Sequence, residues 1–233
     1  GGASISFPYA HGQTSSFTLY AQWSANSLTV TYDSQLGSAI TAGLTTTGSS
    51  ISASPGTPTR TGYTFTGWFT GATGGTVISF PYSHGQTSSF TLYAQWSANS
   101  LTVTYDSQLG SAISAGSTTT GGSISASPGT PTLTGYTFTG WFTATSGGTA
   151  ISFPYAHGQT SSFTLYAQWS ANSLTVTYDS QSGSAITAGS TTTAGSIAAS
   201  PGTPTRAGYT FTGWFVASSG GTQISFPHTH GQT

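Results

Sequence analysis

Apolar and polar residues alternate in three stretches that recur along the chain. Residues 17–23 (FTLYAQW) place Phe, Leu, Ala and Trp on one face, and residues 28–34 (LTVTYDS) place Leu, Val and Tyr on one face. A period of two is typical of a half-buried strand, so both stretches are predicted to be strands with Thr on the outer face. A third strand is predicted at 63–69 (YTFTGWF), where Gly67 would form a bulge that turns Trp68 toward the apolar face.

Shorter elements are predicted between these strands. Residues 78–82 (ISFPY) indicate a short strand whose Pro81 confines it to an edge or a strand end. Residues 52–59 (SASPGTPT) are typical of a turn, and 37–43 (GSAITAG) indicate a short strand or hairpin arm. No segment keeps a helical period over ten residues without Gly or a Thr cluster, so at most one short helix is expected. The predicted fold class is β-rich (all-β to α+β), with little or no helix.

The whole pattern repeats with a period of 73 residues. Each ISFP motif recurs at this spacing, and its Phe is residue 7, 80, 153 and 226. The stretch SSFTLYAQWSANSLTVTYDSQ occupies residues 15–35, 88–108 and 161–181 without a change. Because an enzyme needs only one good site, identical copies favour a structural array or a multivalent binder.

The three residues Ser-Ala-Asn between the first two strands suit a joint between modules better than a tight hairpin. We therefore predict modules at 27–96, 100–169 and 173–233, the last of them lacking its final strand. Residues 1–23 would be the C-terminal part of a preceding repeat.

Two interpretations of the chain's ends follow from this division. In one, the chain is a segment of a longer array, as the absence of Met also suggests. In the other, the strand at 17–23 completes the last module of another molecule by strand addition. The first is favoured, because the 14 residues beyond three full periods have no use in strand exchange.

The motifs LTVTYDS, PTRTGYTFTGWF and TLYAQW, in this order within each unit, resemble the Listeria–Bacteroides repeat, which is the B-repeat of internalin-type surface proteins. The resemblance implies small β-grasp-like modules in tandem on secreted or wall-attached bacterial proteins, with adhesion and spacing as usual associations. The chain departs from the family in two ways. The acidic-Gly-Gly turn appears only as DSQLGS or DSQSGS, and charged residues are nearly absent.

Composition excludes several classes of partner. Only 2% of residues are charged and the net charge is −1, which cannot support binding to nucleic acid or to an anionic membrane. No apolar run is long enough for membrane insertion, and the absence of Cys excludes disulfides. Aromatic residues make up 13% of the chain, enough for a folded core. A surface with so few charges favours contact with neighbours or a cover of glycan on Ser and Thr.

Candidate chemistry is sparse. Each unit carries one Asp and one His in the HGQT motif, namely Asp33, Asp106 and Asp179, and His11, His84, His157 and His230. Together with Ser they could form a triad, but no G-x-S-x-G elbow is present, so no enzyme activity and no cofactor are predicted. His228 and His230 could chelate a metal, although the other copies have Tyr at the first position, and no metal site is predicted.

Exposed aromatic rings and Thr rows are the remaining candidates. Trp23 and Trp68 share a face with Phe and Leu and are assigned to the core, whereas Tyr20 is the better candidate for stacking on a sugar. Rows of Thr also occur on ice-binding surfaces, but here each row is short and the next copy begins only 73 residues later, so the rows do not form one closely spaced array. Copies differ at Leu36, Leu44 and Val77, which are predicted to be exposed, and these swaps argue against a shared pocket.

The sequence therefore predicts a structural tandem-repeat segment of an extracellular bacterial stalk, fibre or filament. Its expected partner is itself, through neutral Ser/Thr/Gly surfaces whose contacts should be insensitive to salt. The alternative is an adhesin module that binds glycans or a host or neighbouring cell surface. The protein is expected at the bacterial cell surface or secreted.

Overall fold

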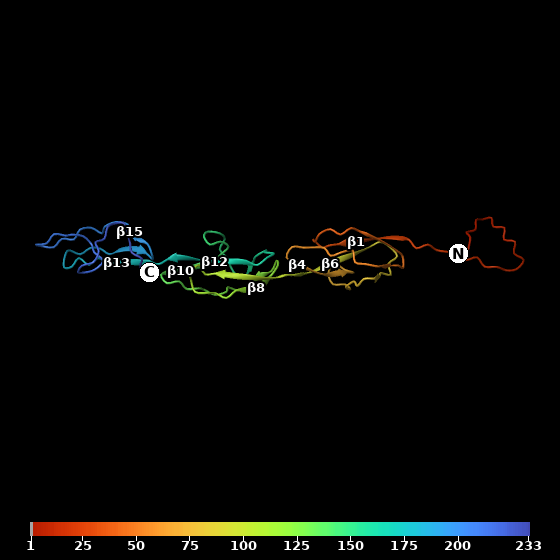
Figure 1. Cartoon of the computed structure of the whole chain (residues 1–233), viewed down its shortest axis with the longest axis horizontal. Helices are drawn as coiled ribbons and strands as arrows, with labels where there is room; N and C mark the ends of the chain where they lie inside the picture. Colours follow the sequence, from red (N-terminus) through yellow and green to blue (C-terminus); the bar gives the residue numbers. More distant parts are fainter. Residues whose placement is uncertain (1) are drawn as a thin grey trace. The chain divides into compact units, whose positions relative to one another are not determined.

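The computed structural model describes residues 2–233, and within these residues it contains strands, turns and no helix (Figure 1). Consequently, no helix in the described part of the chain is long and apolar enough to cross a membrane. The residues fall into two compact units. One holds the chain through Arg60 together with Phe65–Trp96, and the other holds Thr61–Thr64 together with Ser97–Thr233.

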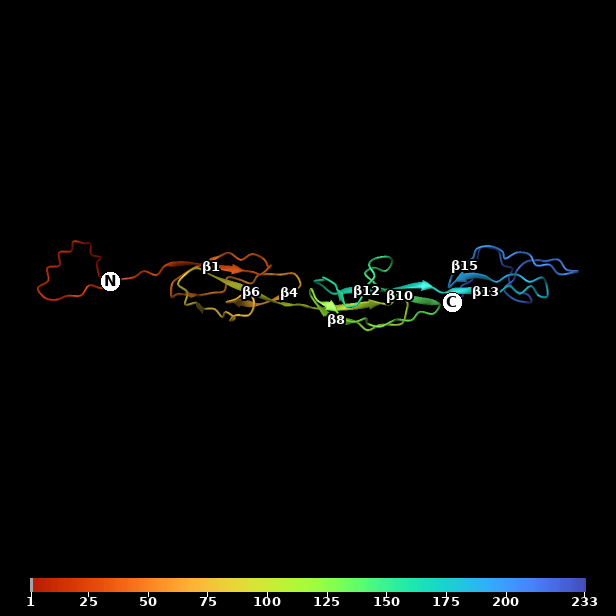
Figure 2. The same cartoon turned by 180° about the vertical axis from the view of Figure 1, so that it is seen from behind.

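The second repeat shows the complete module. Its four-stranded sheet has the order β10-β12-β7-β8, and Figure 2 shows these strands from behind. The strands are β7 (Ser100–Asp106), β8 (Gly116–Thr119), β10 (Tyr136–Phe142) and β12 (Phe163–Ala171). The central pair, β12 and β7, is parallel, and each outer strand is antiparallel to its neighbour. A small second sheet pairs β9 (Ser123–Ile124) with β11 (Tyr155–Ala156).

The first repeat has the same arrangement, with the strand order β2-β1-β6-β4. Its strands are β1 (Ser27–Asp33), β2 (Gly43–Thr46), β4 (Tyr63–Phe69) and β6 (Phe90–Ala98), with β3 (Ser50–Ile51) paired to β5 (Tyr82–Ser83). The β-rich tandem fold predicted from the sequence is thus confirmed.

The alternating faces lie as predicted in these two repeats. In the second repeat Leu101, Val103 and Tyr105 are buried on β7, while the Thr residues between them are exposed. Gly140 has a φ of 142°, and the pairing of β10 with β12 shifts register between Phe138 and Gly140. The bulge predicted at Gly67 in the first copy therefore occurs at its counterpart here, and it brings Trp141 into the core.

Two short elements differ from the prediction. The strand expected at 37–43 begins only at Gly43, because the Ser38 N–H donates to Thr59 O, a contact that is outside the sheet ladder. The strand expected at 78–82 begins only at Tyr82, after a cis Phe80–Pro81 bond, and Ile78 is buried in the core without strand pairing. Residues 52–59, predicted to be a turn, form an irregular segment without strand pairing.

Within the described residues, the third repeat has fewer strands than the other two. It contains β13 (Ser173–Val176), β14 (Gly189–Thr192), β15 (Ser196–Ile197) and β16 (His228–Thr229). Residues 209–215, which correspond to β10, form no strand, and β13 stops three residues before the equivalent end of β7. In the second repeat the corresponding segments, β10 and β7, are both paired with β12.

Residues 17–23 do not form the half-buried strand that their alternation predicts. In Figure 1 the N-terminal segment carries no arrows, and Trp23 is 92% exposed. The prediction that Trp23 lies in a core is wrong for this copy, because the segment has no module around it. The same sequence in β6 and β12 does form a strand, so the difference arises from missing partners and not from propensity.

Candidate functional site

The contact between the second and third repeats lies within one compact unit and centres on Gly135. Gly135 O accepts hydrogen bonds from Asn172 N at 2.9 Å and from Thr193 Oγ1 at 2.6 Å. Asn172 O in turn accepts from Thr193 N at 2.9 Å, and Asn172 Oδ1 accepts from Thr137 Oγ1 at 2.7 Å. The last residue of the Ser-Ala-Asn joint is therefore held by both modules.

The close approach at this junction requires glycine. Gly135 has a φ of 80°, and a Cβ added there would lie 2.7 Å from Thr193 Cγ2 and 3.0 Å from Thr233 Cβ. Such distances leave no room for a side chain without movement of the neighbouring repeat.

Residues Thr61–Thr64 belong to the same compact unit, and Gly62 makes the corresponding backbone bonds there, although Thr120 Oγ1, the counterpart of Thr193 Oγ1, is buried without a hydrogen-bond partner. Asn99 N donates to Gly62 O at 2.9 Å, Thr120 N donates to Asn99 O at 3.0 Å, and Thr64 Oγ1 donates to Asn99 Oδ1 at 2.7 Å. A Cβ on Gly62 would also lie 2.7 Å from Thr120 Cγ2. We call Gly62 with Asn99 and Thr120, and Gly135 with Asn172 and Thr193, the two repeat junctions.

Sequence reasoning located the joint but missed its partners. The pattern identifies Ser-Ala-Asn as the connection, but it assigns no role to the glycine before YTFTGWF or to the third Thr of the TTT motif. One signal was present: Gly62, Gly135 and Gly208 recur at the 73-residue period, as do Thr47, Thr120 and Thr193. No contact inside a single module explains why this glycine and this threonine recur in every repeat.

The candidate Asp residues close turns. Asp33 Oδ1 accepts from Gln35 N at 2.9 Å, and Asp106 makes the same bond to Gln108 N. Both carboxylates are exposed. This is an Asx-turn, in which the side chain imitates the backbone of a tight turn.

The candidate His residues hold a different loop. His157 is buried, its Nδ1 accepts from Gln159 N at 3.0 Å, and its Nε2 lies 3.1 Å from Thr118 Oγ1. An accepting Nδ1 places the proton of the neutral ring on Nε2, which then donates to the Thr hydroxyl. The structure therefore gives His and Asp separate structural partners and does not join them into a triad.

Burial lowers the pKa of His157 below its usual value of 6.5, because charging the ring inside the module is unfavourable. The unfolded chain then binds more protons than the folded one just below pH 6.5. We expect the free energy of unfolding of the second repeat to be fully present above this pH and to fall as the pH drops toward the lowered pKa.

Urea unfolding of wild type and His157→Asn at pH about 7.5 and about 5 measures this effect. The variant cannot titrate at this position, so its second repeat should lose less stability on acidification. Hydrogen exchange of the second repeat, measured alongside urea unfolding, assigns the change to that repeat. An equal loss in both proteins would contradict the assignment.

His230, one of the two candidate metal-chelating histidines, is held by hydrogen bonds within the third repeat. His230 Nδ1 accepts from Gln232 N at 2.9 Å, and its Nε2 lies 3.2 Å from Thr191 Oγ1, so both ring nitrogens are engaged. Within residues 2–233, no group of three or more His, Cys, Asp or Glu could hold a metal ion.

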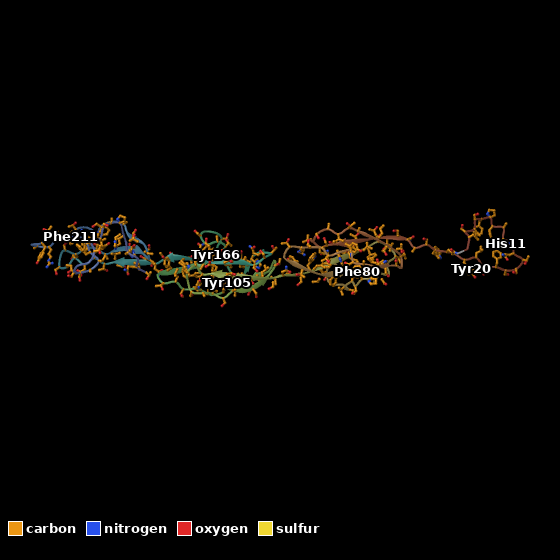
Figure 3. All side chains as sticks on the ribbon, in the orientation of Figure 1. His11, Tyr20, Phe80, Tyr105, Tyr166 and Phe211 are labelled. Atoms are coloured by element: carbon orange, nitrogen blue, oxygen red, sulfur yellow. The ribbon has the colours of Figure 1, made fainter. Side chains whose placement is uncertain are left out.

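Aromatic rings pack inward in the complete repeats. Phe138 lies between Trp141 and Trp169, with ring centroids 5.6 Å from each. Figure 3 labels Tyr105 and Tyr166 within this repeat, and labels Tyr20 on the N-terminal segment. Tyr20 is exposed as predicted, although its counterpart Tyr166 is half-buried because it belongs to a strand.

Three positions that vary between copies, Leu36, Leu44 and Val77, are exposed as their apolar-to-polar swaps predict. Leu36, Leu44 and Val77 all lie among the exposed large hydrophobic residues. Their exposure explains why Ser can replace Leu at the first two positions without loss of packing.

The family model of the Listeria-Bacteroides repeat domain matches the chain three times, over residues 29–95, 102–168 and 175–233. The chain belongs to the Listeria-Bacteroides repeat family. This confirms the resemblance drawn from the three motifs.

Curated relatives carry the same repeats in larger proteins. Internalin H of Listeria monocytogenes is 42% identical over 121 residues, which is 51% of this chain and 21% of that protein. A putative membrane protein of Evansella cellulosilytica is 30% identical over 198 residues, which is 85% of this chain and 29% of that protein. A putative Gly-rich membrane protein of the same organism is 30% identical over 197 residues, which is 84% of this chain and 22% of that protein.

The chain thus spans less than a third of the length of these relatives. It is a tandem-repeat segment of the type found in bacterial surface proteins.

Proposed function

We propose that this segment serves as a spacer in an extracellular bacterial stalk, fibre or filament, with the number of modules setting its length. The observation that carries the proposal is the pair of matching repeat junctions. Both use a Gly carbonyl, the Asn of the joint and a Thr amide, with hydrogen-bond lengths that agree within about 0.1 Å. Nearest-neighbour contacts that repeat in this way are what a one-dimensional array requires.

The chemistry of the junctions suits an extracellular location. They consist of backbone groups, Asn, Gly and Thr, with no ionised side chain in the contact. Contacts of this kind do not depend on charge pairing, so salt should leave them unchanged.

The glycan-binding alternative has less support. The core tryptophans Trp68 and Trp141 are buried, and Trp96 and Trp169 are half-buried against the core. No recurrent exposed ring is left on the complete modules for stacking on sugars, whereas an adhesive array would present the same ring in each copy.

Lengthening the joint tests the proposal. Two glycines inserted after Ala171 should release Asn172 from Gly135 and let the third repeat reorient, while each repeat stays folded. Small-angle scattering should show a broader distribution of interatomic distances than for wild type.

The matched control inserts the same two glycines between Ser218 and Ser219, in an exposed loop inside the third repeat. This variant should scatter like wild type. If both insertions leave the scattering unchanged, the joint does not fix the orientation of the modules and a spacer role loses its basis.

A further inference from the structure

The glycine of the first repeat junction is enclosed by two segments of the second repeat. A Cβ added to Gly62 would lie 2.7 Å from Thr120 Cγ2 and 3.0 Å from Thr160 Cβ, so both threonines pack closely over the glycine. Thr120 directly follows β8, and Thr160 ends the loop 157–160, which has the sequence HGQT. Gly62 belongs to the same compact unit as these two segments. We call Thr120 and the HGQT loop 157–160 the seat of Gly62.

His157 links the two segments of this seat. Its Nε2 lies 3.1 Å from Thr118 Oγ1 on β8, and its Nδ1 accepts a hydrogen bond from Gln159 N at 3.0 Å. Gln159 O accepts from Gly121 N at 3.3 Å, which is a backbone bond between the same two segments. The imidazole ring is therefore bonded to both segments that enclose the glycine.

The third repeat builds a seat for Gly135 in the same way. A Cβ added to Gly135 would lie 3.0 Å from the Cβ of Thr233, which ends the HGQT motif of that repeat. Gln232 O accepts from Ala194 N at 2.9 Å, and both ring nitrogens of His230 are bonded. Both junctions thus share one arrangement, in which the His of the HGQT motif holds the loop that covers a glycine of the preceding repeat.

This arrangement requires a neutral ring. Because His157 Nδ1 accepts from a backbone N–H, the proton of the ring lies on Nε2. A protonated ring donates from both nitrogens, so it cannot accept from Gln159 N, and two N–H groups would face each other at 3.0 Å. The loop has to change its conformation to separate them.

The surroundings of the ring do not compensate a positive charge. The ring centroid of His157 lies 4.8 Å from that of Phe163 on β12 and 6.3 Å from that of Tyr155 on β11, and Thr118 is its partner on β8. Among these described neighbours none is charged, and only Tyr155 can titrate, as a phenol that is neutral in acid. Burial accordingly lowers the pKa of His157 below 6.5.

We propose that protonation of His157 opens the repeat junction at Gly62 while the second repeat stays folded. This inference rests on the proposed function and adds its regulation, since a spacer built from these modules holds them near neutral pH and releases them in acid. The altered loop moves Thr160 away from Gly62. The hydrogen bonds between β7 and β12 do not involve the ring, so the sheet of the second repeat keeps its pairing.

The direction of the pH effect follows from proton binding. Between 6.5, the usual pKa of a His side chain, and the lowered pKa of the seated ring, the open junction binds one more proton than the closed one. The ratio of open to closed junctions therefore rises by up to about tenfold for each unit by which the pH falls within this range.

Nuclear magnetic resonance of the full chain between pH about 7.5 and about 4.5 tests the proposal. The nuclear Overhauser contact between Gly62 Hα and the Thr160 methyl group should be present at the higher pH. It should be lost in step with the titration of the His157 ring, followed in the same samples. Hydrogen exchange should show a matching loss of protection at the Asn99 amide, which donates to Gly62 O. Contacts within the aromatic core of the second repeat should persist throughout.

His157→Asn separates protonation of the ring from its other contacts. The side-chain Oδ1 of Asn can accept from Gln159 N as the ring nitrogen does, but Asn does not titrate. The variant should therefore keep the contact between the glycine and the threonine at both pH values. His84→Asn makes the same change in the first repeat, where the ring has the equivalent two bonds, and it should leave the loss of contact in acid unchanged.

Three results would overturn the proposal: a contact between Gly62 and Thr160 that is absent at the higher pH, one that persists when the His157 ring is fully protonated, or one that is lost at the same pH in His157→Asn. If the variant loses its core contacts, the two wild-type titrations decide alone. The spacer function is tested separately, because the glycine insertion after Ala171 is compared with wild type at constant pH. A junction that stays closed in acid would leave that function standing.

Discussion

Replacing Trp141 with alanine should destabilise the second repeat by about 3–5 kcal/mol, enough to unfold a module of this size. The side chain is 2% exposed and lies in T-shaped contact with Tyr105 at 5.2 Å and with Phe138 at 5.6 Å. Its Nε1 also donates to Gly129 O at 3.1 Å. Truncation removes the largest buried ring of the module and leaves a cavity beneath the bulge at Gly140.

Trp214→Ala is the matched control, since Trp214 makes the equivalent bond to Gly202 O at 3.1 Å but lines an open pocket of about 690 Å³ in the third repeat. Its loss should cost clearly less in the free chain, because a half-exposed ring has less packing to lose. Hydrogen exchange resolved by repeat measures both. Equal destabilisation by the two substitutions would show that the third repeat is packed like the second.

Gly135→Ala should separate the second repeat from the third. Alanine at a φ of 80° costs about 1–2 kcal/mol through the backbone alone, and its Cβ would also collide with Thr193. The expected result is loss of protection at the Asn172 and Thr193 amides, which hydrogen exchange detects.

Gly208→Ala carries the same backbone strain with a φ of 78°, but no atom lies near its Cβ. Comparison of the two variants isolates the contact between modules from the conformational effect of alanine. If Gly208→Ala exposes Asn172 as much as Gly135→Ala does, the junction does not depend on the close approach at Gly135.

The strands were predictable where a segment's own alternation decides its faces. Residues 28–34 and 63–69 bury the positions that a period of two assigns to the core, and the bulge follows from a glycine between Thr66 and Trp68. These features follow from the pattern of neighbouring residues, so they can be predicted from one sequence alone.

Pairing and docking were not predictable in the same way. Residues 17–23 have the sequence of β12 but lack its neighbours, so the same letters give a strand in one place and an irregular segment in another. Residues 37–43 contain a plausible strand pattern, yet the hydrogen bond from Ser38 to Thr59 draws them away from the sheet. The approach of Gly135 to Thr193 joins residues 58 apart in two modules, and no local pattern encodes such a contact.

The central claim is that the joint holds successive modules in one orientation. Because the chain contains no Cys, spin labels can be attached at Ser117→Cys and Ser190→Cys, two exposed strand positions one period apart. Pulsed electron–electron double resonance then gives the distribution of distances between the two spin labels, one on the second repeat and one on the third. The account predicts a single narrow distribution that broadens when two glycines follow Ala171. A broad distribution in the unmodified chain, unchanged by the insertion, would contradict it.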